Sequence, residues 1–462
     1  MANSMIATFR RLFYAPVALA LAMVLAATPA FAQVSGIRDA EIERLLRSYT
    51  DPILVAAGLD PKGVKIYILN DPTLNAFVSN GQNIYIHTGL IMELDTPNQL
   101  IGVIAHETGH IAGGHLVRRR DAMEDAAVPI IVSMLAGVAA IFAGAPDLGM
   151  GLITGGQHVA TRSILSFTRA QESSADQAGL SFLNATCQSG RGMTAVFERF
   201  NEQELMTARR QDPYARTHPM SRDRLAALER GVESSPCVNK TDSPMALYQY
   251  EMMRAKLRGF IEKPEVTLRR YPPGVNSDAA HYARAIAYFK QPNFEKSMAE
   301  VDALLARYPD NPYFHELRGQ IFVESARPTE GIPDYERAVA LLPDEPLLRV
   351  SLAGAIVASE DQARMKDAKR ELVLAMAQDN TNALGWRYLA TAEERLGEHG
   401  LANLASAEMH FAIRNYPQAM QFARRAKGEL TEGSIEMQRA VDIIAITTAQ
   451  MQDDDGGREA RR

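Results

Sequence analysis

The stretch His106-Glu107-Thr108-Gly109-His110 places two histidines four residues apart, with a glutamate next to the first. On a helix, positions i and i+4 lie roughly 40° apart around the axis, so both imidazoles can bind one ion. Residues 98–105 lead into the motif with apolar side chains at helical spacing and no helix breaker. We therefore expect a mid-helix metal site at His106 and His110, with Glu107 placed to polarise a metal-bound water.

An apolar and polar alternation over residues 83–90, Asn-Ile-Tyr-Ile-His-Thr-Gly-Leu, precedes this helix. The period of two predicts a half-buried strand. We expect it to run along the cleft and to pair with the backbone of a bound polypeptide.

Catalytic zinc takes three protein ligands, so the sequence must supply one more. His115 comes five residues after His110, and on a continuing helix it would face away from the ion. We expect it to have a structural role or to contact a ligand rather than the metal. Glu172, in Gln171-Glu172-Ser173-Ser174-Ala175-Asp176, is the better candidate for the third ligand.

A second predicted helix carries Glu172 and Asp176 on one face, where Asp176 could orient a metal-bound histidine. The alternative is a solvated charged face, but the small residues at 173–175 and Gly179 favour close helix packing. Two histidines and one carboxylate also suit iron, and the glutamate inside the motif favours hydrolysis and one zinc ion per chain.

A third segment, Thr217-His218-Pro219 followed by Arg224, comes after these two motifs in the sequence. The chain resembles the gluzincin peptidases that include HtpX and the CAAX prenyl protease, which carry H-E-x-x-H and a later E-x-x-A-D. The resemblance implies zinc bound by His106, His110 and Glu172, and Glu107 as general base. It also implies that His218 either caps the zinc or contacts the oxyanion.

Two of these positions have simpler explanations. His218 precedes a proline and could be an ordinary turn histidine. Arg224 is either a residue of the site or a plain salt-bridge partner.

The N-terminus predicts export. Arg10-Arg11 precedes an apolar run and the small-x-small pattern Ala30-Phe31-Ala32, so residues 1–32 are expected to be a cleavable signal peptide, read by the general secretory or the twin-arginine route. Export would place the mature chain in the periplasm. There Cys187 and Cys237, the only cysteines, form either a disulfide or two free thiols.

Residues 126–144 contain no charged side chain and are rich in aliphatic residues. Pro129 and the glycines at 137 and 144 interrupt them, which favours a buried or membrane-surface helical hairpin, usable as a lid, over a membrane span. The composition is otherwise ordinary, with 462 residues and a formal net charge of −6, and it indicates no nucleic-acid partner.

The C-terminal half shows a repeat, because Tyr308-Pro309-Asp310 recurs as Leu342-Pro343-Asp344 at a spacing of 34 residues. That is the tetratricopeptide period, and Gly319, Phe322, Tyr335 and Ala338 fit its pattern. We expect four to five repeats between Asp278 and Ala449, with a non-repeating helical bundle as the alternative.

The chain is therefore predicted to be mainly α. A zincin-type α+β metalloprotease domain with a small edge sheet (33–235) leads through a linker and connecting helix (236–277) to an α-solenoid of tetratricopeptide repeats (278–450). Residues 451–462 are expected to form a disordered tail.

Together, the motifs and the repeats resemble the periplasmic members of this family that carry a tetratricopeptide domain. That resemblance implies quality control of outer-membrane proteins. Unfolded or misassembled barrel proteins would be the substrates, and the repeats would dock on the barrel-assembly machinery, so the protein could be peripheral to the outer membrane. The alternative is a chaperone or assembly scaffold whose protease site is normally auto-inhibited.

Overall fold

The computed structural model describes residues 36–79, 82–118, 121, 131–136, 146–203, 213–219 and 221–459. The expected signal peptide, residues 1–32, lies outside the described residues, as does most of the apolar segment 126–144. Within the described ranges, no helix combines the length and apolar character needed to cross a membrane.

A small mixed sheet forms one side of the N-terminal domain (36–233). Its strands are β1 (Gly36–Ile37), β2 (Ile66–Leu69), β3 (Ala76–Ser79) and β4 (Asn83–His87), in the order β1-β2-β4-β3. Strand β4 is parallel to β2 and antiparallel to β3, so it lies in the interior of the sheet. The expectation that residues 83–90 border the cleft is therefore wrong, because both hydrogen-bonding edges of β4 are occupied and β3 is the free edge.

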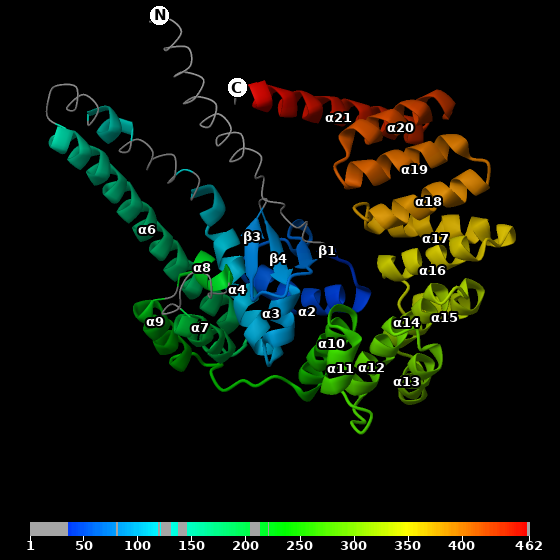
Figure 1. Cartoon of the computed structure of the whole chain (residues 1–462), viewed down its shortest axis with the longest axis horizontal. Helices are drawn as coiled ribbons and strands as arrows, with labels where there is room; N and C mark the ends of the chain where they lie inside the picture. The colour runs from blue at the N-terminus through cyan, green and yellow to red at the C-terminus, as the bar shows by residue number, and fades with distance from the viewer. Residues whose placement is uncertain are drawn as a thin grey trace, which may run out of the picture.

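Helices cover the other face of this sheet and build the domain core (Figure 1). Helix α4 begins after Thr96, whose side chain accepts a hydrogen bond from the Gln99 amide, and Pro97 occupies its first turn. The helices are α2 (Ala40–Ala56), α3 (Thr88–Glu93), α4 (Pro97–Ala112), α6 (Pro146–Ala185), α7 (Arg191–Gln203), α8 (Pro213–Thr217) and α9 (Arg222–Glu233), with the 3-10 turn η1 (Pro61–Gly63).

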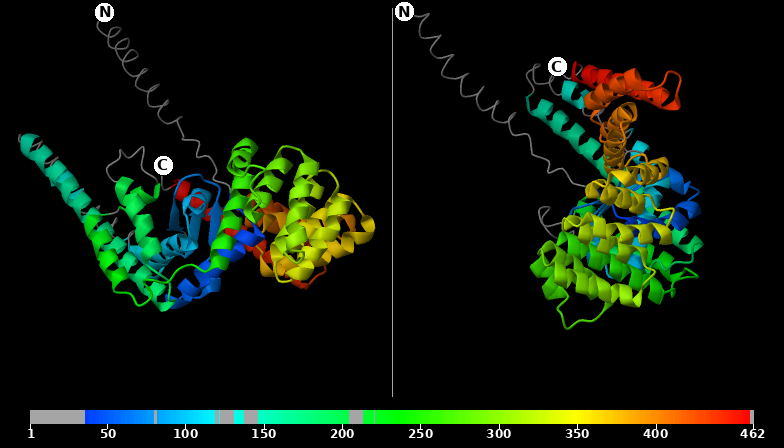
Figure 2. Two further views of the ribbon diagram at one scale, coloured as in Figure 1. Left: turned by 90° about the horizontal axis from the view of Figure 1, so that it is seen from below. Right: turned by 90° about the vertical axis from the view of Figure 1, so that its right-hand side faces the viewer.

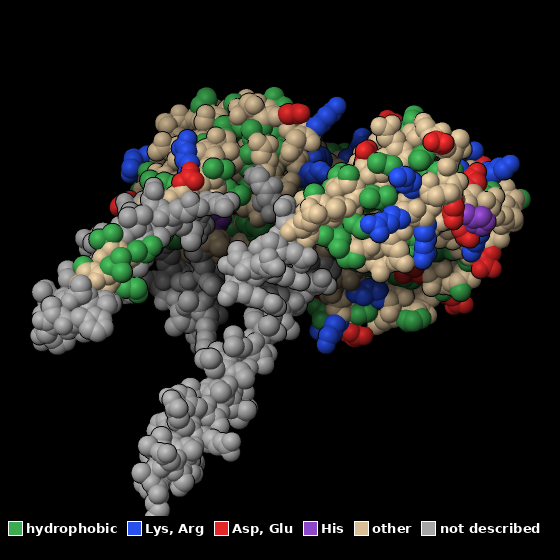
Figure 3. All heavy atoms as spheres, turned by 90° about the horizontal axis from the view of Figure 1, so that it is seen from above, with side chains coloured by type: hydrophobic (Ala, Val, Ile, Leu, Met, Phe, Trp, Pro, Cys, Tyr) green, Lys and Arg blue, Asp and Glu red, His purple; other side chains and the backbone are tan. Residues whose placement is uncertain are grey.

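The outer half of α6 projects from the rest of the molecule, on the side away from the repeats (Figures 1 and 2). The described residues 131–136, inside the apolar segment, are helical. They include Ile131, Val132, Met134 and Leu135, which are each about half exposed or more. In Figure 3 a small group of hydrophobic side chains is visible on the arm that projects from the molecule.

Helix α10 (Pro244–Ile261) joins the two halves, and α11 (Pro264–Arg270) follows it. Tyr250, Met253 and Leu257 on α10 belong to the core of the N-terminal domain, whereas Met252 and Ala255 belong to the core of the first repeat. The connecting helix is thus shared by both cores.

The repeats form five antiparallel helix pairs, within the expected four to five. They are α12 (Asp278–Lys290) with α13 (Phe294–Arg307), α14 (Pro312–Glu324) with α15 (Pro328–Leu341), α16 (Pro346–Ser359) with α17 (Met365–Gln378), α18 (Ala383–Arg395) with α19 (His399–Ala412), and α20 (Tyr416–Glu429) with α21 (Ile435–Glu459). The 3-10 turn η2 (Gln362–Arg364) separates α16 from α17 and displaces the later repeats from the 34-residue register.

The repeats curve around the outer face of the sheet, so that in Figure 1 they form an arc from α12 to α21. Arg38, next to β1, pairs with Asp379 after α17 at 2.7 Å, which ties the sheet to the third repeat. Helix α21 continues to Glu459, into the segment expected to be disordered. Extending an existing helix gains one hydrogen bond for each residue ordered, whereas starting one is costly.

Candidate active site

Three helices bring the predicted metal ligands together. Helix α4 supplies His106 and His110, α6 supplies Glu172, and His218 directly follows α8. One ligand atom from each of these four residues lies within 4.8 Å of the others. The Nε2 atoms of His106 and His110 are 3.1 Å apart, and His218 Nδ1 is 3.1 Å from Glu172 Oε2.

Glycines permit this approach of α4 and α6. A Cβ atom on Gly109 would lie 2.7 Å from the carbonyl oxygen of Ala175, and one on Gly179 would lie 3.1 Å from the carbonyl of Ala105. Contacts this short are rare for real Cβ atoms, so any larger residue would push the helices apart. The close packing expected from the small residues of α6 is confirmed.

The donor set fits zinc, because zinc is bound by imidazole nitrogens and carboxylate oxygens in sites of this size. His106 and Glu172 are almost fully buried, and His110 is partly buried. Both carboxylate oxygens of Glu107 are buried and form no hydrogen bond with any described residue. A buried carboxylate without hydrogen bonds is costly unless the site supplies a donor such as a metal-activated water.

Burial raises the pKa of Glu107, so its carboxylate is a stronger base than an exposed one. Burial opposes ionisation of Glu172 too, but the nearby His218 and His106 hold its pKa well below the usual value. Burial and the neighbouring His106 lower the pKa of His110 to about 2, which keeps this imidazole neutral as a ligand must be.

Asp176 and Arg224 contact the candidate metal ligands on the side away from the cluster centre. Asp176 Oδ1 lies 3.0 Å from His106 Nδ1, on the opposite side of the ring from the cluster. Arg224 donates to both oxygens of Asp176 at 2.7 and 2.8 Å and to the carbonyl of Pro219 at 2.6 Å. Its guanidinium also lies 3.3 Å from Glu172, so it contacts groups that position three of the four cluster residues.

His115 contacts a ligand, but not in the way a continuing helix would place it. Helix α4 ends at Ala112, and Gly114 has a φ of +60°, a left-handed conformation that glycine adopts without strain. This turn folds His115 back, so that its Nδ1 lies 3.0 Å from Nδ1 of His110.

Tyr214 belongs to the site although no motif of the sequence predicts it. Its ring is fully buried and stacks on His218, with centroids 4.5 Å apart. The signal was present as an aromatic residue one helical turn before His218, in Tyr214-Ala215-Arg216-Thr217-His218.

A cleft of about 690 Å³ opens onto Glu107, His110, Glu172 and His218. Phe77 and Val78 of the free edge strand β3 line one wall. An extended polypeptide placed in this cleft could add to β3 as a further strand.

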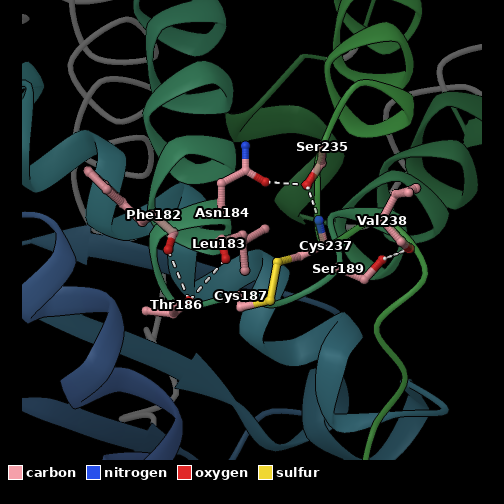
Figure 4. The surroundings of a disulfide bond; sticks show 9 residues. All are labelled: Phe182, Leu183, Asn184, Thr186, Cys187, Ser189, Ser235, Cys237 and Val238. Atoms are coloured by element: carbon pink, nitrogen blue, oxygen red, sulfur yellow. Dashed lines mark hydrogen bonds between the residues drawn. A yellow bond between two sulfur atoms is a disulfide. The ribbon is translucent and has the colours of Figure 1, made fainter.

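The two cysteines form a disulfide (Figure 4). Their Cα atoms are 5.3 Å apart. Cys187 follows α6 and Cys237 follows α9, so the bridge links the helix of Glu172 to the segment beyond Arg224. Ser189 donates a hydrogen bond to the carbonyl of Val238 at 2.7 Å beside it.

Residues 37–232 match the model of peptidase family M48, and residues 268–312 and 282–346 match a tetratricopeptide-repeat model. The chain is 25% identical to the beta-barrel assembly-enhancing protease of Escherichia coli (strain K12), over 81% of this chain and 76% of that protein. It is also 25% identical to a putative beta-barrel assembly-enhancing protease of Vibrio cholerae serotype O1, over 86% of this chain and 82% of that protein.

A mitochondrial metalloendopeptidase, OMA1 of Schizosaccharomyces pombe, is 26% identical over 41% of this chain and 55% of its own length. This alignment covers less than half of the chain, unlike the two alignments with beta-barrel assembly-enhancing proteases. The motifs, the geometry of the candidate metal-binding cluster and these matches agree, and the chain is a metalloprotease that carries a peptidase family M48 domain at residues 37–232 followed by tetratricopeptide repeats.

Proposed function

We propose that this chain is a periplasmic zinc endopeptidase that degrades unfolded or misassembled outer-membrane proteins, with its repeats recruiting the substrate or the barrel-assembly machinery. The observation that carries the proposal is the convergence of His106, His110, Glu172 and His218 beside the buried carboxylate of Glu107. The names of the bacterial relatives support the link to barrel assembly.

Each residue of the site has a distinct role in the proposed hydrolysis. His106, His110 and Glu172 would hold a zinc ion, which when bound would polarise the scissile carbonyl and acidify the attacking water. Glu107 accepts the proton of that water and delivers it to the leaving amine. Asp176, Arg224 and His115 keep the ligands in position.

His218 has two possible roles that its position supports. Its Nδ1 is 3.1 Å from Glu172 and its Nε2 is 3.6 Å from Glu107 Oε1, so it lies between a proposed ligand and the proposed base. As a fourth ligand it would close the site and keep the enzyme inactive at rest. With the site open, its imidazole would stabilise the oxyanion.

The second candidate function is a chaperone or assembly scaffold with an auto-inhibited protease site. The membership of His218 in the ligand cluster favours it, because catalytic zinc sites keep one position open for water. Five stacked helix pairs also offer an extended binding surface that needs no catalysis.

The test is time-resolved degradation of an unfolded outer-membrane protein by the zinc-loaded mature chain. Glu107→Gln should abolish cleavage and leave zinc binding intact, while Glu229→Gln, on the exposed face of α9, should change neither. Faster cleavage by His218→Ala would establish inhibition by this histidine, and slower cleavage would assign it to the oxyanion. No cleavage by any variant with zinc bound would refute the protease and favour the scaffold.

A further inference from the structure

Three aromatic rings form a ladder across the outer face of the sheet. Tyr67 on β2 pairs with Tyr85 on β4, and Tyr85 pairs with Phe77 on β3. Adjacent ring centroids are 5.0 Å apart and the planes are tilted by only 17° and 10°. All three rings are partly exposed, whereas Ile68, Ile84 and Ala76 on the opposite face are buried in the core.

The two ends of this ladder lie in different cavities. Phe77 lines the catalytic cleft beside Glu107 and His218. Tyr67 lines a second cavity of about 600 Å³, between the sheet and the residues around α16 and α17 of the third repeat. The aromatic surface therefore runs without interruption from the repeats to the catalytic cleft.

The wall of the second cavity contains four cationic residues and three acidic ones, Glu43, Glu345 and Asp379, so it carries a small excess of positive charge. Arg38 bridges Glu43 and Asp379 at 2.7 Å each, and Arg47 pairs with Asp51. The other two cations in its wall, Arg44 and Lys65, are exposed and form no ion pair with any residue that the structure describes. Their charge complements an acidic group on whatever enters this cavity.

We propose that the aromatic ladder, which we define as Tyr67, Tyr85 and Phe77, is the surface that guides an extended substrate polypeptide from the repeats into the cleft. The segment it selects carries aromatic side chains and an acidic residue on the repeat side, where Arg44 and Lys65 receive it. This inference rests on the proposed function, since it names the substrate class and route for the same site.

The dimensions suit an extended chain. Strands lie about 4.8 Å apart, so the ladder spans roughly 10 Å, the length of about three extended residues. Flat aromatic rings bind other aromatic side chains by offset or edge-to-face contacts, and aliphatic side chains gain only the area they bury. A peptide in which aromatic residues occupy alternate positions would present them all on one side, because side chains alternate along a strand, and about two of them would lie on the ladder at once.

Binding is the direct test, measured by fluorescence anisotropy with the zinc-loaded full chain carrying Glu107→Gln, so that no peptide is cut. Three labelled peptides of about twelve residues are compared. The first has tyrosine at alternate positions and one glutamate, the second replaces the glutamate by lysine, and the third replaces the tyrosines by leucine. The first should bind most tightly.

Tyr67→Ala should weaken binding of the first peptide about three- to tenfold, the size of effect that one aromatic contact supplies, and should leave the leucine peptide nearly unchanged. Tyr67→Phe should restore binding. Tyr308→Ala is the matched control, because Tyr308 is 40% exposed and lines neither cavity. Equal affinity of the first peptide for the parent and Tyr67→Ala would overturn the proposal.

A second arm separates this inference from the proposed protease activity. In the chain with Glu107 intact, Tyr308→Ala should cleave the tyrosine peptide and a short peptide that occupies only the cleft as the parent does, while Tyr67→Ala should raise KM for the tyrosine peptide more than KM for the short peptide. Loss of short-peptide cleavage in Tyr67→Ala would mean a damaged site and would also overturn the proposal. If the parent cuts no peptide, the proposed function fails, and the anisotropy data still decide whether the ladder binds.

Discussion

Replacing Arg224 by alanine removes a cation that contacts Asp176, Glu172 and the Pro219 carbonyl beside the candidate metal site. Arg224 is 6% exposed and forms a two-pronged pair with Asp176 at 2.7 and 2.8 Å. Removing one partner of a buried pair costs about 3–5 kcal/mol, because the remaining charge is left buried and unpaired. Asp176 retains its contact with His106, so we expect the lower end, about 3 kcal/mol of unfolding free energy.

The same change should weaken zinc binding about 10- to 100-fold, the usual cost of removing an outer partner of a metal ligand. The expected reason is that His106, through Asp176, and His218, through the Pro219 carbonyl, both lose a fixed orientation. Arg224→Lys should recover only part of either loss, since an ammonium group cannot form the two-pronged pair.

Urea unfolding of the metal-free chain measures the change in unfolding free energy, and competition with a chelator measures the change in zinc affinity. Arg230→Ala is the matched control, because it removes an exposed arginine from the same helix α9. An Arg224→Ala chain that unfolds at the parent urea concentration and holds zinc equally well would refute this account of the site.

Two further predictions concern stability. The double change Cys187→Ser and Cys237→Ser removes a disulfide between residues 50 apart in sequence. It should lower the unfolding free energy by on the order of 4 kcal/mol. Equal unfolding midpoints for the oxidised parent and the double variant would contradict this prediction. Burial raises the pKa of Glu393 on α18 from 4.5 to about 7, so the folded chain holds this proton more tightly than the unfolded chain. Its contribution to stability is therefore complete below about pH 4.5 and is lost as the pH rises through about 7. Glu393→Gln should reduce the fall in urea midpoint between about pH 5 and about pH 8, and an unchanged fall would rule out Glu393 as its source.

Much of the site could be predicted because its main residues lie in short sequence motifs. Helical spacing places His106 and His110 on one face, and Glu172 and Asp176 on one face, without any knowledge of the tertiary structure. The 34-residue period likewise predicts paired helices, since each pair buries its apolar face only against the next.

Local pattern failed where a neighbour or a turn decided the outcome. The alternation of residues 83–90 predicts a strand but carries no information about which strands flank it, and the structure puts β4 inside the sheet. His115 reaches His110 because Gly114 adopts a left-handed conformation. The geometry of a continuing helix contains no such turn.

The sequence by itself determined the ligand types, their helical spacing and the repeat period, because these depend on covalent order and on the geometry of single helices. Only the tertiary structure decided that β3 forms the cleft edge, that Tyr214 stacks on His218, and that Arg224 reaches Asp176, Glu172 and Pro219 at once. Those contacts join residues from separate elements, so their distances depend on how the elements pack and not on the pattern along any one of them.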